Sequence, residues 1–313
     1  MESLKVTSNY EFNPDTLDEV RKELNLNKNE INNMLDNLQD WIAKQEHFTK
    51  KDFSRRYLET CLIQAKGSVE RTKTNLEKLC TLKTLLPTYF EKHNAKDFED
   101  FSNFVIHGPV AKILKDNYRL YFVKLVSSDF DASALLEYYR YVILLNEYTR
   151  IHDYSFGTVC VVDCRDVNLL SFVAKMTNIV DLRNTMSIMM VGYGLRIKAI
   201  YVISESKTVD VFVTVLKQVL SKKVSERIKV VKTVEALHEF VDKENLPKDY
   251  GGGVNKTLKE INENWTNVIS TKENVEFFKD IFQAKTDEKY RLSDRYNEEV
   301  LGMPGSFRTL SVD

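Results

Sequence analysis

The acidic side chains at the ends of predicted strands are the first candidates for chemistry. Asp163 ends one apolar run, Asp166 follows it closely, and Glu205 comes after another such run. Enzymes with alternating strands and helices place functional groups at such carboxyl ends. Gly192 and Gly194, however, precede a strand, and no P-loop, Gly-x-Gly-x-x-Gly after a strand, Gly-x-Ser-x-Gly or His-Glu-x-x-His occurs. The sequence therefore predicts no catalytic residue and a protein that is not an enzyme.

The residues that could hold a metal ion are few and dispersed. The four cysteines, Cys61, Cys80, Cys160 and Cys164, form no Cys-x-x-Cys pair, and the five histidines are scattered along the chain. A zinc site needs several such ligands together, so we expect no metal and no cofactor. A chain of 313 residues also does not depend on disulfides for its core, which favours reduced thiols.

The net charge and the hydropathy of the chain limit the kinds of molecule that it is expected to bind. The net charge is −1, so no global field attracts nucleic acid or a membrane, and an anionic partner would need a local basic patch. The opening MESLKVTSNYEF lacks the basic and apolar regions of a signal peptide. No apolar stretch reaches the ~18–20 residues that span a bilayer. These features predict a soluble, cytoplasmic protein that does not bind nucleic acid.

Apolar residues in the first part of the chain recur with helical spacing. Between 27 and 44 they include Ile31, Leu35, Leu38 and Ile42, which form one stripe of an amphipathic helix. Similar runs cover 53–65 and 69–86, and Pro87 ends the last of them. We therefore expect a helical lobe over residues 1–90.

The pattern changes after a polar stretch. Residues 91–108 lead to His107-Gly108-Pro109, which predicts a linker closed by a turn. Short apolar runs then alternate with helical patterns, which predicts βαβ units. We expect an α/β lobe over 109–253, with a mixed, largely parallel sheet and crossover helices, and a last segment over 254–313 that holds a polar helix at 257–268. Strands are predicted at 120–125, 158–163, 197–203 and 228–231, and helices at 133–148, 167–190, 209–222 and 234–244.

The segment 209–220 is more apolar than a helix on a sheet requires. At 100° per residue its apolar side chains cover an arc of about 200°, whereas ~100° suffices for packing on a sheet. The excess indicates deep burial, a further apolar partner, or exposure when the protein opens. On its residues alone, a buried crossover helix is the simpler interpretation.

Several motifs resemble one known family when they are taken in order. GSVERTKTNLEKLCTLKTLLPTYF, GTVCVVD, YGLRIKAIYVI, LPKDYGGG and the final GSFR with Leu310 and Asp313 are similar to segments of CRAL-TRIO domain proteins. The resemblance implies a helical lobe followed by an α/β lipid-binding lobe. It also implies an intracellular carrier of a retinoid, tocopherol, carotenoid or phospholipid that has no catalytic residues and exchanges its cargo at endosomal or other membranes. Residues 209–220 would be the mobile gate over the pocket.

Position along the chain and the resemblance together predict the walls of that pocket. Each of these residues is also compatible with ordinary core packing. Polar anchors for the cargo are sought among Tyr138, Tyr141 and Ser171. The predicted hydrophobic-ligand residues are Tyr138, Tyr141, Leu144, Ile188, Met189, Ile200, Val202, Val209, Phe212, Val213 and Leu216.

A basic patch is predicted at one edge of the same lobe. Lys223 and Arg227 stand four residues apart, and Arg196 and Lys198 share a face where a strand begins. The run LSKKVSERIKVV resembles the family segment that binds phosphoinositide head groups, although Ile63 stands where some members carry an arginine. A solvated charged face is the alternative for the patch. For the whole protein, the alternative is an interaction scaffold with a vestigial pocket.

Overall fold

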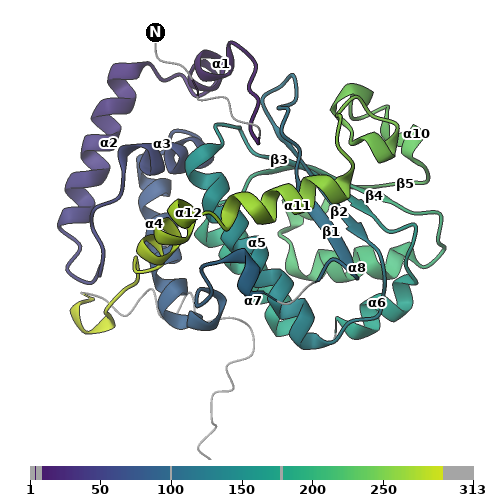
Figure 1. The fold of residues 1–313 in the computed structure, drawn as a ribbon. Coiled ribbons are helices and arrows are strands. Elements are labelled where there is room, and N and C mark those ends of the chain that lie inside the picture. The colour runs from purple at the N-terminus through teal and green to yellow at the C-terminus, as the bar shows by residue number, and fades with distance from the viewer. Residues whose placement is uncertain (1–3, 5–8, 99–100, 177–178, 292–313) are drawn as a thin grey trace, which may run out of the picture.

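The computed structural model describes residues 4, 9–98, 101–176 and 179–291. Helices form the N-terminal part, at the left in Figure 1. The Asn27 side chain accepts hydrogen bonds at one helix start, where Glu30 completes a capping box, and Ser54 and Ser68 cap the next two helices. The three helices predicted from periodicity are therefore confirmed. These elements are α1 (Thr16–Glu23), α2 (Lys28–Ala43), α3 (Arg55–Gln64) and α4 (Val69–Leu85), followed by turns at Pro87–Tyr89 and Ala95–Asp97.

A mixed sheet forms the second part of the molecule. Its five strands lie in the order β1-β2-β3-β4-β5, with β1 antiparallel to β2 and all other pairs parallel. This arrangement confirms the predicted α/β fold class. The strands are β1 (Val105–Pro109), β2 (Arg119–Leu125), β3 (Thr158–Asp163), β4 (Ile197–Ile203) and β5 (Ile228–Val231).

The turn predicted at His107-Gly108-Pro109 is wrong, because these residues form the second half of edge strand β1. A Cβ on Gly108 would lie 2.9 Å from the Trp265 ring, so the glycine makes room for a helix packed on the strand. Pro109 ends the strand at the edge of the sheet, where its missing N–H costs no ladder hydrogen bond. Gly108 is therefore explained by the close packing of a helix, and Pro109 by its position at the sheet edge, and neither forms a turn.

Crossover helices connect the strands and cover the sheet. The helix predicted over 167–190 is two helices followed by a π-helical turn, and the one predicted over 234–244 ends after a single turn. On one face of the sheet Tyr201 stacks on Phe240 and Phe122 contacts Tyr250. The elements are α5 (Ala132–His152), α6 (Leu169–Lys175), α7 (Ile179–Ser187), the π turn (Ile188–Gly192), α8 (Val209–Val219), α9 (Lys222–Ser225) and α10 (Val234–Leu237), with short turns at Lys243–Asn245 and Lys248–Tyr250.

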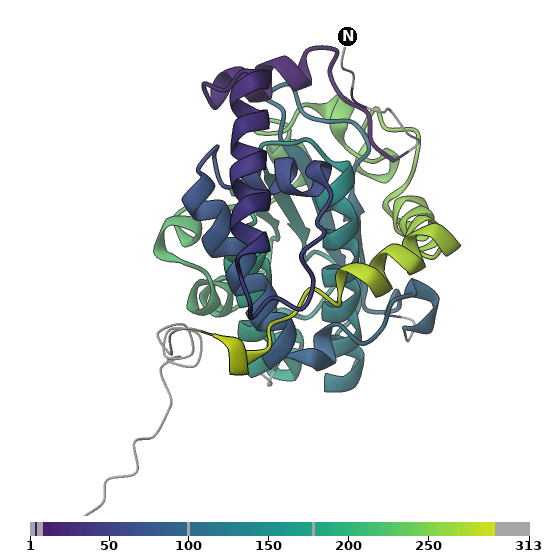
Figure 2. The same ribbon diagram turned by 90° about the vertical axis from the view of Figure 1, so that its left-hand side faces the viewer.

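The end of the described chain returns to its beginning. Helix α11 (Leu258–Ile269) crosses the sheet beside β1, and α12 (Lys272–Ile281) lies among the N-terminal helices (Figure 1). The Lys83 ammonium on α4 donates to the Ile281 carbonyl at 3.0 Å, and Thr84 bonds to Thr286. Figure 2 shows the yellow segment after α12, which includes the turn Glu288–Tyr290, beside the lower end of these helices.

Candidate functional site

A cavity of about 230 Å³ lies between one face of the sheet and the helices that cover it. Its walls come from the end of β1, from β2, β3 and β4, from α5, α7, the π turn and the end of α8, and from α3 of the N-terminal part. The lining residues are Thr60, Gln64, Pro109, Arg119, Tyr121, Val123, Val142, Leu145, Asn146, Thr149, Arg150, Asp153, Ser155, Thr158, Cys160, Val162, Met186, Met189, Met190, Tyr193, Leu195, Ile197, Ile200, Leu216 and Leu220.

The sheet wall is built from alternate residues of neighbouring strands. Tyr121, Cys160 and Ile200 stand side by side across β2, β3 and β4 in the strand register, and all three line the cavity. Side chains of a strand alternate between its two faces, so Val123 and Val162 extend the same wall. Burial raises the pKa of the Cys160 thiol to about 12, so this thiol is uncharged at neutral pH and acts as an apolar surface.

The helix wall is adaptable. Met186, Met189 and Met190 enter from α7 and the π turn, and Leu216 and Leu220 close the cavity at the end of α8. Methionine is unbranched and polarisable, so it fills irregular space without one fixed shape. The wall is therefore suited to an apolar ligand of irregular outline.

One part of the lining is polar and already paired within the protein. Arg119 and Asp153 form a buried ion pair, with Nη2–Oδ1 and Nε–Oδ2 distances of 2.8 and 3.1 Å. Ser155 donates to the same carboxylate, and the Thr149 hydroxyl bonds within α5. These residues lie at the end of α5 and at the first residue of β2, so the polar side chains gather at the amino edge of the strands.

A buried carboxylate joins the helical part to the sheet part beside this polar region. Glu147 on α5 is fully buried and accepts hydrogen bonds from the hydroxyls of Tyr57 on α3, at 2.8 Å, and Tyr193. The ammonium of Lys83 on α4, also fully buried, lies 3.8 Å from the carboxylate. Burial, and after it the charge of the Glu147 carboxylate, raises the pKa of both tyrosines, which therefore stay protonated. The contact holds α3 and α4 against α5.

The predicted pocket residues divide between the cavity and the surrounding core. Met189, Ile200 and Leu216 line the cavity. The other predicted residues lie outside its lining: Tyr138, Tyr141, Leu144, Ile188, Val202, Val209, Phe212 and Val213. Ser171, a candidate anchor, is exposed on α6.

On α5 the cavity faces a different stripe from the predicted one. Val142, Leu145 and Asn146 line the cavity, whereas Tyr138 and Tyr141 pack on the His107 ring with centroid distances of 4.9 and 5.2 Å. Burial lowers the pKa of His107 to about 3, so its ring is neutral among these aromatic side chains. Helix α5 has apolar residues around most of its circumference because it also packs on α3, α11 and α12. Periodicity therefore does not identify the cavity side.

On α8 only the last turns reach the cavity. Val209, Phe212 and Val213 at its start are buried, and Phe212 meets Phe172 of α6 with ring centroids 6.4 Å apart. Leu216 and Leu220 lie farther along and cover the cavity. The first turns of α8 therefore pack on the core, and its last turn lines the cavity.

The predicted basic residues are only partly together. Arg196, Lys223 and Arg227 lie near Lys66, which follows α3, and their positive charges lower the Lys66 pKa, with Arg196 as the largest cause. Arg196 has one buried guanidinium nitrogen, Nη1, without a hydrogen-bond partner among the described residues. Lys198 instead forms an ion pair with Asp116. Periodicity and spacing could not find Lys66, because it comes from the other lobe.

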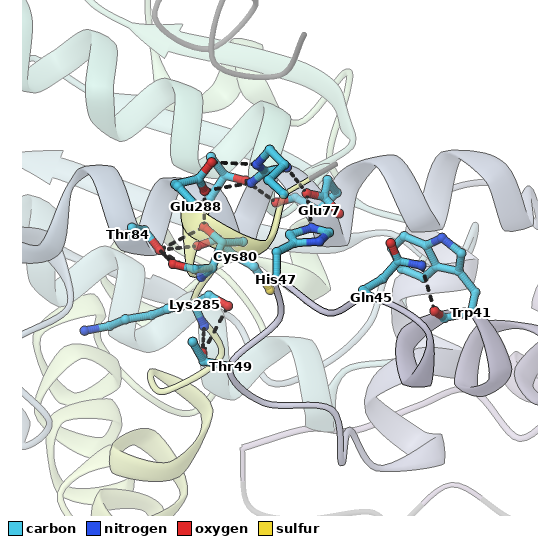
Figure 3. A network of polar contacts seen from close by, with 12 residues as sticks. Trp41, Gln45, His47, Thr49, Glu77, Cys80, Thr84, Lys285 and Glu288 are labelled. Carbon is cyan, nitrogen blue, oxygen red and sulfur yellow. Dashed lines mark hydrogen bonds and ion pairs between the residues drawn. The ribbon is translucent and has the colours of Figure 1, made fainter. Parts of the chain in front are cut away.

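A second hollow, of about 280 Å³, is polar and lies between α2, α4 and the segment after α12. Figure 3 shows His47 directed at Glu77, with a nitrogen–oxygen distance of 2.7 Å. Glu77 also pairs with Arg291, whose Nη2 donates to Thr81 at 2.9 Å. The polar groups of this hollow therefore hold the C-terminal segment on α4.

Comparison with known proteins agrees with this architecture. No curated protein sequence matches the chain. Among solved structures, the crystal structure of Sfh5 has a TM-score of 0.50 at 12% identity, covering 82% of this chain and 98% of that one, so the likeness concerns the fold. No helix in the described ranges is long and apolar enough to cross a membrane. The CRAL/TRIO domain model matches residues 91–252, which include all five strands of the described sheet and with them the sheet wall of the cavity, and the chain therefore belongs to the CRAL/TRIO family of lipid-binding proteins.

Proposed function

We propose that the protein carries a small hydrophobic molecule in the cavity between the sheet and α5, α7 and α8. The observation that carries this proposal is the lining itself, in which apolar side chains from the sheet and from α5, α7, the π turn and α8 converge on one space. Packed protein interiors contain few voids larger than a water molecule, so a cavity of this size supports a binding role. Its contents belong to the retinoid, tocopherol, carotenoid or phospholipid class that the family resemblance implies.

Burial alone is sufficient to hold such a cargo. Transfer of a methylene from water to an apolar site contributes about 0.8 kcal/mol, so ten methylenes contribute roughly 8 kcal/mol before association costs. That value corresponds to micromolar binding. No covalent chemistry is required for carriage.

Helix α8 is the proposed gate. Its covering residues Leu216 and Leu220 are only partly buried, and Val211 on the same helix is 41% exposed. Leu170 on α6 and Val180 on α7 are likewise exposed, at 51 and 57%. Outward movement of α8 would open the cavity next to these apolar side chains, and contact with a bilayer would then compensate the exposed surface.

The test of carriage is native mass spectrometry of the protein purified without denaturation, followed by solvent extraction. We expect one apolar molecule per chain, released into the organic phase. A protein that remains empty after incubation with mixed cellular lipids would favour the alternative, in which the fold is an interaction scaffold.

We also propose that Lys66, Arg196, Lys223 and Arg227 bind phosphate head groups when the protein reaches a membrane. Arg196, Lys223 and Arg227 together lower the Lys66 pKa, which supports a concentrated positive charge at this place. Lys66 would provide, from the helical part, the cation that Ile63 does not. A phosphoinositide is the anionic lipid that suits such a cluster.

Replacing both Lys66 and Lys223 by Ala should weaken binding to phosphoinositide-containing vesicles by about 30-fold, since each basic residue near the surface contributes about 1 kcal/mol. Both lysines are exposed, so the fold should persist. Vesicle co-sedimentation at low salt measures the effect. Lys198→Ala is the matched control, because Lys198 is neutralised by Asp116. Equal losses in the control and the double variant would contradict the proposed cluster.

A further inference from the structure

A buried polar atom in the cavity wall has no hydrogen-bond partner among the described residues. Gln64, the last residue of α3, donates from Nε2 to the backbone carbonyl of Ser155 at 3.1 Å. A carbonyl oxygen only accepts, so this contact fixes the orientation of the carboxamide. The other end, Oε1, is buried and makes no hydrogen bond to any part of the chain that the structure describes. A buried acceptor left in this state requires a donor.

A second carboxamide lies in the same wall. Asn146 on α5 lines the cavity, and its side chain makes no hydrogen bond within the described ranges. It stands next to apolar lining residues, Val142 and Leu145. The cavity thus offers an acceptor at Gln64 and both a donor and an acceptor at Asn146, all of them uncharged.

Most donor atoms of the charged side chains nearby are directed at protein partners. Arg119 is paired with Asp153 through Nε and Nη2, and its Nη1 faces backbone carbonyls that include Val110. Arg150 donates from Nη1 to the Tyr193 carbonyl at 2.5 Å and from Nε to the Cys61 sulfur at 3.2 Å. The uncharged groups that remain for a ligand are the two amides and the Thr158 hydroxyl, which also lines the cavity and makes no hydrogen bond within the described ranges.

We infer that the cargo carries an uncharged hydroxyl head that donates a hydrogen bond to Gln64 Oε1 or Asn146. This inference rests on the proposed carrier function and names the class of molecule carried. A hydroxyl both donates and accepts, which matches the amides, whereas a carboxylate only accepts and would face Gln64 Oε1 with like partial charge. The apolar body of the cargo then lies along the methionines and the sheet wall.

The experiment compares decanol, decane and decanoate as competitors of a fluorescent apolar probe bound to the full chain. The quantity measured is the affinity for decanol relative to decane, which cancels the contribution of the hydrocarbon body. Gln64→Met keeps the length of the side chain and removes the acceptor. We expect it to lower this ratio about tenfold, the effect of one lost hydrogen bond. The ratio for decanoate should not fall.

Gln218→Met on the exposed side of α8 is the matched control, and it should leave both ratios unchanged. Asn146→Leu provides a second variant in case Gln64→Met does not fold, and it should also lower the decanol ratio. Unchanged decanol ratios in both cavity variants would overturn the hydroxyl inference, as would a parallel loss for decanoate. If wild-type protein binds none of the three compounds, carriage itself fails, and the inference fails with it.

Discussion

Replacing Glu147 by Gln is expected to lower the free energy of unfolding by about 3–5 kcal/mol, the usual result of removing one partner from a buried ion pair. The Lys83 ammonium, 3.8 Å from this carboxylate, would be left without a counter-charge in a site that excludes water. Gln still accepts one tyrosine hydrogen bond, so the loss arises chiefly from the charge. Urea denaturation followed by circular dichroism measures it.

The control for this variant is an exposed ion pair. Asp116→Asn removes the partner of Lys198, whose side chain is about half exposed, and such surface pairs contribute only ~0–1 kcal/mol. A loss below about 1 kcal/mol in Glu147→Gln would show that the contact between α3, α4 and α5 does not depend on the charge. A change in the slope of the unfolding free energy against urea concentration, with an unchanged midpoint, would indicate that the helical part and the sheet part unfold separately.

Replacing Cys160 by Trp is expected to abolish cargo binding. Cys160 lies at the middle of the sheet wall between Tyr121 and Ile200, so an indole there occupies the space of the ligand. Exclusion of about four methylenes removes roughly 3 kcal/mol of binding free energy, more than a hundredfold in affinity. Native mass spectrometry of purified variant and wild-type protein compares the fraction that carries a ligand.

Val230→Trp is the matched control for the added ring. Val230 lies in β5 of the same sheet but is 41% exposed and does not line the cavity. This variant should carry cargo as the wild type does. If Cys160→Trp folds and retains its ligand in full, the cargo binds elsewhere on the molecule.

The strands were the most predictable elements of the fold. The bounds of β3, β4 and β5 agree with those predicted, because each is a short, mostly apolar run with clear ends. Strand β1 was missed since His107, Gly108 and Pro109 are turn residues by composition. In the structure Gly108 leaves room for Trp265 and Pro109 ends a strand at the sheet edge. Both roles depend on contacts with residues far away in the sequence.

The site was less predictable than the fold. Met189, Ile200 and Leu216 were predicted from their positions in a helix or strand, and they line the cavity. Helix α5 is apolar around most of its circumference, so its sequence does not show which side faces the cavity. Gln64 and Lys66 belong to the helical lobe, and only the tertiary contact of α3 with α5 brings them to the cavity and the basic cluster. The tail GSFRTLSVD, which supported the family resemblance, lies outside the described residues.

The attachment of the C-terminal segment to α4 has a consequence for how the chain is made. Thr84 and Glu77 bind partners 202 and 214 residues later in the sequence, at Thr286 and Arg291. At synthesis rates of about 5–20 residues per second, those partners leave the ribosome roughly 10 to 40 seconds after α4. During that interval Glu77 has the His47 ring but lacks Arg291, and the Lys83 ammonium lacks the Ile281 carbonyl. Helix α4 therefore reaches its final packing only after residues 281–291 have been made, and nascent chains should stay sensitive to proteases near α4 until then.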